Sequence, residues 1–114
     1  MVIGRNVIVS IITPDGDVDI LAKVDTGAYS SSLDESFFKS LNLDEEVVKN
    51  KMVRNVHGEE KRDVYDIDLI IKGKKISSEI NVFDRSQMKY KMILGRKDIK
   101  SLGALVDVTK KDDN

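Results

Sequence analysis

The stretch Ile20-Leu21-Ala22-Lys23-Val24-Asp25-Thr26-Gly27-Ala28 decides how this 114-residue chain can be interpreted. Its first five residues are typical of a buried strand, and an aspartate, a hydroxyl side chain and a glycine follow at once. A carboxylate at the end of such a strand needs polar partners, and the glycine lets another backbone or a ligand approach closely. Because Asp-Thr-Gly alone is also a common turn sequence, the interpretation depends on what accompanies it.

Composition limits the classes of protein to consider. The chain is 40% hydrophobic and 34% charged, as expected of a soluble globular protein, with residues 1–109 as a single domain and 110–114 as a polar C-terminal tail. A net charge of −1 argues against nucleic acid or a membrane surface as the main partner. The chain has no cysteine, no signal-peptide core and no apolar run near the roughly 20 residues that span a membrane. We therefore expect a cytoplasmic protein.

Hydrophobic alternation predicts an all-β fold. Strands are expected at residues 7–12, 18–24, 51–56, 62–71, 76–83, 90–94 and 104–108. The first two strands would form a hairpin around Thr13-Pro14-Asp15-Gly16-Asp17. Short helices are expected at 34–41, where a loop is the alternative, and at 96–102, where Gly103 would end the helix. Many short strands with one or two short helices indicate a closed or nearly closed β-barrel.

A second segment accompanies the first at a distant position in the sequence. Ile93-Leu94-Gly95-Arg96 precedes the expected helix, far from Asp25-Thr26-Gly27-Ala28 in the sequence. With these two segments, the chain resembles the retropepsin-like aspartic proteases. The order and spacing of the segments agree with that family over nearly the whole chain. This resemblance implies a barrel that carries one half-site per chain, with Asp25, Thr26 and Gly27 as the catalytic loop.

The resemblance also assigns supporting roles. Thr26 would bond across a two-fold axis to the partner loop, and Ala28 would keep the substrate cleft wall small. Leu94, Gly95 and Arg96 form the structural signature, in which Gly95 packs beneath the catalytic loop and Arg96 joins an ion-pair network near the dimer contact. Tyr29 stands where the viral enzymes carry an acidic residue, so Arg96 lacks that partner here.

One half-site per chain implies a homodimer. Two carboxylates about 3 Å apart share one proton, so one activates a water molecule while the other protonates the leaving nitrogen. Asp-Thr-Gly occurs once in the chain, so the second aspartate would be Asp25 of another copy. We therefore expect a homodimeric aspartic endopeptidase.

The expected hairpin around His57-Gly58 falls where retropepsins carry a mobile flap. The resemblance implies that Ala28, His57, Gly58 and Arg85 contact substrate, with the Arg85 guanidinium suited to a carboxylate. The alternatives are a solvated hairpin tip for His57-Gly58 and a surface charge or salt-bridge partner for Arg85.

A closer resemblance is to the RimK-associated family labelled ATP-dependent zinc proteases. Ala22 to Ala28, Ser31-Ser32-Leu33 and Asp84 to Tyr90 leading into Leu94-Gly95-Arg96 carry it. RimK-type ligases add glutamates to protein tails, so the resemblance implies acidic or glutamate-extended peptides as substrates and such a ligase as a candidate partner. The sequence features that favour acidic peptides are the cations Arg54, Lys61, Arg62 and Arg85.

Neither zinc nor ATP follows from the residues. A catalytic zinc usually has three protein ligands, and this chain has one histidine, no cysteine and no Gly-rich phosphate loop. We expect no metal and no other cofactor. Two alternatives stay open: a non-catalytic, dimeric retropepsin-like module that binds peptide or regulates a ligase, and a zinc hydrolase that uses His57 with Asp25 or Asp84.

Three further groups receive structural interpretations. Ser30-Ser31-Ser32 is expected to be a satisfied turn or the start of a strand rather than a nucleophile. Asp44-Glu45-Glu46 is expected to be a solvated face, and Phe37, Phe38 and Leu41 are expected in the core.

Overall fold

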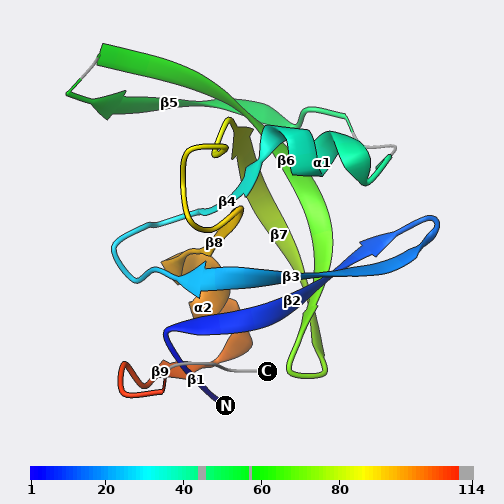
Figure 1. Cartoon of the computed structure of the whole chain (residues 1–114), viewed down its shortest axis with the longest axis vertical. Coiled ribbons are helices and arrows are strands. Elements are labelled where there is room, and N and C mark those ends of the chain that lie inside the picture. Colours follow the sequence, from blue (N-terminus) through cyan, green and yellow to red (C-terminus); the bar gives the residue numbers. More distant parts are fainter. Residues whose placement is uncertain (44–45, 57, 111–114) are drawn as a thin grey trace.

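The computed structural model describes residues 1–43, 46–56 and 58–110. It is mostly β, with a closed six-stranded barrel and two short helices, which confirms the fold class predicted from the sequence (Figure 1). The elements are β1 Val2–Ile3, β2 Asn6–Thr13, β3 Gly16–Val24, β4 Ser31–Asp34, α1 Glu35–Ser40, β5 Lys49–Asn55, β6 Gly58–Ile71, β7 Lys74–Phe83, β8 Met92–Leu94, α2 Arg96–Leu102 and β9 Leu105–Val106.

The strands of the main sheet follow the order β2-β3-β8-β4-β7-β6-β5, and a further pairing of β2 with β6 closes the barrel. The first hairpin pairs β2 with β3 from Asn6↔Lys23 to Thr13↔Gly16, which confirms the prediction for residues 7–24. The Thr13 hydroxyl donates to the Gly16 carbonyl at 2.5 Å, and Gly16 has a φ of 117° that favours glycine.

The β5–β6 hairpin is longer than the sequence predicted. Its register runs from Lys49↔Val64 to Asn55↔Gly58, so β6 begins at Gly58 rather than at residue 62. Glu59, Glu60 and Lys61 lack the apolar alternation that marks a strand, and cross-strand pairing extends the hairpin through them. Figure 1 shows the hairpin in green, projecting beyond the barrel over β4 and the segment before β8.

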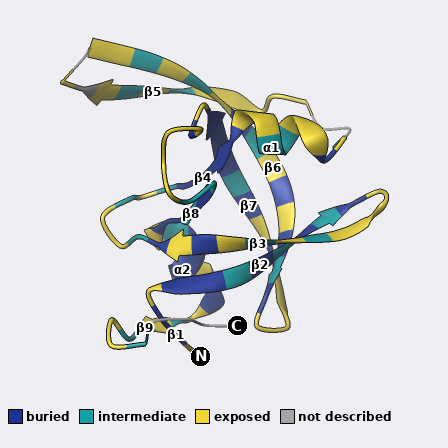
Figure 2. Ribbon diagram, viewed as in Figure 1, coloured by how far each residue is buried: buried dark blue, intermediate teal, exposed yellow. Residues whose placement is uncertain are grey.

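The core lies inside the barrel, and Figure 2 shows buried residues alternating with more exposed ones along much of the long strands. The fully or nearly fully buried members include Val7, Val9, Ile11, Leu33, Ile67, Leu69, Ile71, Ile80, Met92 and Leu94. Each such aliphatic side chain removed from water contributes about 1.5–3 kcal/mol. Leu41 is buried in this core as predicted, whereas Phe37 and Phe38 are half-buried against it.

Both predicted helices are present. Asp34 caps α1 by accepting a hydrogen bond from the Phe37 N–H at 3.2 Å, so the helix and not the alternative loop is correct. Gly103 ends α2 in the left-handed conformation, with a φ of 66°. No helix in the described part of the chain is long and apolar enough to cross a membrane.

The two ends of the described chain meet. β9 is shorter than predicted and pairs in parallel with β1, through Val2↔Leu105 and Ile3↔Val106. The Arg5 N–H donates to the Lys110 carbonyl at 3.0 Å. The last four residues of the expected polar tail lie outside the described residues, as do Asp44 and Glu45 of the acidic cluster; Glu46 is exposed.

Candidate active site

Asp25 lies where β3 leaves the barrel. Val24 is buried and pairs with Leu94 of β8, while Asp25 is half-buried directly beyond it. The Val24 N–H donates to the Arg5 carbonyl at 2.9 Å, and the Asp25 N–H donates to the Leu94 carbonyl at 3.0 Å. The backbone of Asp25 is therefore fixed by two neighbouring segments, and its side chain keeps access to solvent.

The loop after Asp25 is folded around its carboxylate. The Gly27 N–H donates to Asp25 Oδ1 at 2.9 Å, and the Ala28 N–H donates to the Asp25 carbonyl at 3.2 Å. A Cβ atom on Gly27 would lie 3.1 Å from Asp25 Oδ1, a tight contact that glycine avoids. Thr26 and Gly27 are exposed at the tip of this loop, and Ala28 is half-buried.

Gly95 and Arg96 hold the loop from the other side. A Cβ atom on Gly95 would lie 2.5 Å from the carbonyl carbon of Ser30, so this crossing has no room for a side chain. The Arg96 N–H donates to the Ala28 carbonyl at 2.8 Å, and Arg96 Nη1 donates to the Thr26 carbonyl at 2.9 Å. The Arg96 guanidinium lies 5.8 Å from the Tyr29 ring, so Tyr29 contacts it in place of an acidic partner.

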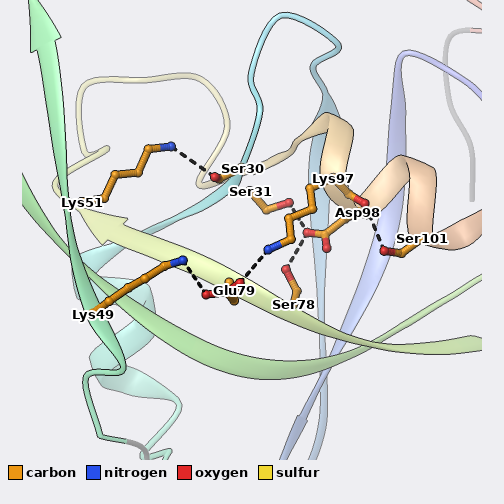
Figure 3. Close-up of polar contacts among 9 residues, drawn as sticks. All are labelled: Ser30, Ser31, Lys49, Lys51, Ser78, Glu79, Lys97, Asp98 and Ser101. Carbon is orange, nitrogen blue, oxygen red and sulfur yellow. Dashed lines mark hydrogen bonds and ion pairs between the residues drawn. The ribbon is translucent and has the colours of Figure 1, made fainter.

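A buried polar cluster supports the same crossing. The hydroxyls of Ser31 and Ser78 both donate to Asp98 Oδ2 at 2.5 Å (Figure 3). The Ser31 hydroxyl also accepts a hydrogen bond from the Gly95 N–H at 3.0 Å. All three side chains are at most 3% exposed, so these hydrogen bonds offset the cost of burying a carboxylate.

Sequence reasoning placed Ser31 in a satisfied turn or strand start but did not single out Asp98 or Ser78. The available signal was an aspartate near the start of a short helix, beside the apolar Ile99 and Leu102, where a solvated residue would be unusual.

Arg85 is buried, which rules out the interpretation as a surface charge. The backbone N–H of Arg85 donates to Asp34 Oδ1 at 2.8 Å, and its side-chain Nε donates to the Tyr90 carbonyl at 3.0 Å. Burial and the nearby Arg62 charge lower the pKa of Arg85, and the negative charges of Asp34 and Asp25 oppose that effect. Arg85 therefore closes the 84–90 loop and contributes positive charge to the surroundings of Asp25.

Two of the three cations on the β5–β6 hairpin that were expected to attract acidic peptides already bond residues of this chain. Arg54 pairs with Glu59 at 3.0 Å. Arg62 donates to Glu60 at 3.3 Å and to Asn81 Oδ1 at 3.2 Å, and its guanidinium lies 3.5 Å from the centre of the Phe83 ring. Lys61 is exposed.

Of the two predicted flap residues, the structure describes only Gly58. Gly58 opens β6 with a φ of 119°, whereas His57 lies outside the described residues. Within the ranges that the structure covers, no group of three or more His, Cys, Asp or Glu side chains could hold a metal ion.

The family can now be assigned. Residues 39–112 match the model of the RimB-like family, described as the retropepsin-like aspartic endopeptidase RimB. The chain belongs to the RimB-like family. The matched segment begins after the Asp25 loop, so this assignment is independent of the Asp-Thr-Gly motif and confirms the resemblance inferred from the sequence.

Solved structures place the RimB-like chain in the same fold. A Legionella pneumophila protein with unknown function (DUF785) is 20% identical and superposes with a TM-score of 0.70. The alignment covers 97% of this chain and 95% of that one. EIAV protease complexed with an inhibitor is 24% identical and superposes with a TM-score of 0.72. That alignment covers 90% of this chain and 91% of the protease. At these identities the likeness shows a shared retropepsin-like fold.

Proposed function

We propose that two copies of this chain form an aspartic endopeptidase whose catalytic pair is Asp25 from each copy. The observation that carries the proposal is the position of Asp25, half-buried at the end of β3 and held by Gly27 on one side and by the Leu94-Gly95-Arg96 segment on the other. Such a rigid, accessible carboxylate can meet its counterpart across a two-fold axis.

Hydrolysis would follow from the proton that the pair shares. The ionised Asp25 takes a proton from water, whose oxygen attacks the peptide carbonyl carbon, while the protonated Asp25 donates to the carbonyl oxygen. The Asp25 that is now protonated then donates its proton to the leaving nitrogen, and the other Asp25 takes a proton from one hydroxyl of the tetrahedral species. The carbon–nitrogen bond breaks as the carbonyl re-forms, which leaves the pair with one shared proton again. The two copies are related by symmetry, so either Asp25 can act as the base and neither has a fixed role.

The surrounding residues receive roles by their positions. Thr26 is exposed beside Asp25 and would bond to the partner loop, while Ala28 and Gly58 would line the substrate path. The same role for His57, which lies outside the described residues, comes from the resemblance alone. Substrate contact by Arg85 stays a prediction; its burial and its hydrogen bond to Tyr90 favour positioning of the 84–90 loop.

Acidic or glutamate-extended peptides are the proposed substrates, and a RimK-type ligase is the proposed partner. Both proposals come from the RimK association of the resembling family. A cytoplasmic location, and the absence of nucleic acid and membrane among the partners, stay predictions from composition.

The decisive experiment is the substitution Asp25→Asn. The asparagine amide would keep the shape of the side chain but could not act as a base, so we expect peptide hydrolysis to fall by at least about a thousandfold while the dimer stays folded. Asp15→Asn, a change in an exposed turn, serves as the matched control. The readouts are cleavage of a fluorogenic peptide library from acid to neutral pH, and sedimentation equilibrium. Full activity of Asp25→Asn would refute the proposal, and peptide binding without hydrolysis by the wild type would favour the non-catalytic module.

A further inference from the structure

A cavity of about 390 Å³ lies between the Asp25 loop and the β5–β6 hairpin. Tyr29 and Ser30, just beyond the catalytic loop, form one wall, and residues 49–52 of β5 form another. Its volume lies within the range of about 300–1,000 Å³ that is common for ligand pockets. Its place beside the loop makes it a natural side-chain subsite for a peptide bound at Asp25.

The cavity is lined by an excess of positive charge. Among its described lining residues are three lysines, Lys49, Lys51 and Lys97, and one carboxylate, Glu79. Glu79 is already bound on both oxygens, to Lys97 Nζ at 2.6 Å and to Lys49 Nζ at 2.8 Å (Figure 3). Hydrogen bonds from Lys49 and Lys97 lower the pKa of Glu79 to about 2, so these three residues form a closed, ionised group.

Lys51 stands apart from this group. Its Nζ donates to the Ser30 hydroxyl at 3.1 Å, and no described carboxylate forms an ion pair with it. Burial, and repulsion from Arg62 and Lys49, lower the pKa of the Lys51 ammonium. An ammonium has three N–H donors, so Lys51 keeps donors and an uncompensated charge for a ligand.

Asn81, a further polar residue of the lining, is already bonded within the chain. Asn81 accepts from Ser32 and Arg62 through Oδ1, and its amide nitrogen donates to the Ser31 carbonyl at 2.9 Å. Tyr29 and Met52, both more than half exposed, offer apolar surface at the rim. The cavity thus combines one available cation with surface that suits the methylene groups of a flexible side chain.

We propose that this cavity is a specificity subsite that takes a carboxylate side chain of the substrate, with Lys51 as its direct ion-pair partner. The proposal rests on the proposed peptidase function for its position beside Asp25. It also assigns the acidic preference, which the sequence attributed to Arg54, Lys61, Arg62 and Arg85, to a lysine that sequence reasoning did not single out.

The test compares peptides that differ only in Glu, Gln or Lys at each position in turn. For the wild type we expect kcat/KM to favour Glu over Gln by about tenfold at one position, as for a charge-assisted hydrogen bond. Lys51→Gln should remove that preference, Lys51→Glu should shift it toward Lys, and Lys51→Arg should keep it. Lys75→Gln, an exposed change on β7 outside the cavity, should leave it unaltered.

A binding experiment separates this subsite from catalysis. The same peptides, labelled for fluorescence anisotropy, are titrated into full-length Asp25→Asn protein with Lys51 intact or changed to Gln. A Glu preference that depends on Lys51 supports the subsite even where hydrolysis is absent. Equal behaviour of Glu and Gln peptides, a preference that survives Lys51→Gln, or no peptide binding at all would overturn it, whatever Asp25→Asn does to hydrolysis.

Discussion

At the scale of single residues, Gly95 is the glycine at which an added Cβ atom would make the shortest contact. A Cβ atom there would lie 2.5 Å from the carbonyl carbon of Ser30 and 2.6 Å from its oxygen, and backbone cannot rotate away as a side chain can. Gly95→Ala must therefore push apart the Asp25 loop and the start of α2. We expect it to lower the free energy of unfolding by about 3 kcal/mol, measured by urea denaturation.

A second glycine provides the matched control for this prediction. Gly73 has a φ of 78° in the turn between β6 and β7, and a Cβ atom there would meet nothing within 4 Å. Asn tolerates the left-handed conformation, so Gly73→Asn should cost no more than about 1 kcal/mol. Equal stability of the two variants would show that the Gly95 crossing is looser than the structure indicates.

Residues differ in how far sequence alone predicts their roles. Asp25, Gly95 and Arg96 were identifiable because short motifs carry them. Asp98 and Lys51 were not, because their roles depend on contacts made by folding: Asp98 meets Ser31 across 67 positions of sequence, and Lys51 meets Ser30 across 21. A lysine in a polar hairpin looks the same in sequence whether it faces solvent or a cavity.

The same distinction applies to the elements. The β2–β3 hairpin and both helices were predicted because local turn and cap residues specify them. β4 was at most anticipated as a strand start, because serines favour turns, and its pairing with β7 and β8 supplies the strand conformation. The pairing of β1 with β9 joins opposite ends of the chain, so no local pattern could indicate it.

Glu79 connects three elements and makes their association dependent on pH. It lies on β7 and bonds Lys49 of β5 and Lys97 of α2, which lower its pKa from 4.5 to about 2. A carboxyl group whose pKa is lower in the folded state stabilises that state above its unfolded pKa. This contribution is therefore complete above pH 4.5 and is lost as the pH falls toward 2.

We accordingly expect Glu79→Gln to lower the free energy of unfolding by about 1 kcal/mol at neutral pH. Full conversion of the pKa shift would give more, but the Glu79 side chain is 33% exposed and solvent screens the interaction. The difference from the wild type should shrink steadily between about pH 4.5 and about pH 2 in urea titrations. A difference that stays constant over this interval would mean that Glu79 acts by packing and not by charge.

At the scale of the whole molecule, apolar surface lies beside the catalytic loop. An open hollow of about 850 Å³ is lined by Thr26, Tyr29, Ile99 and Ala104, among others. Leu105, the residue after Ala104 and the first of β9, is 72% exposed. Apolar surface adjoining a half-site is suited to a second copy, which would bring the two Asp25 loops together.

This arrangement predicts that association and activity fail together. Leu105→Glu should raise the dimer dissociation constant at least about tenfold by sedimentation equilibrium, because dimerisation would bury its charge. Val47→Glu, which places the same charge on a 44% exposed valine before β5, should leave it unchanged. The activity of Leu105→Glu should also rise with the square of protein concentration when most chains are monomeric, since each site needs two Asp25 residues. Activity linear in concentration from a monomeric variant would require a complete site within one chain, and the composite Asp25 pair would then be wrong.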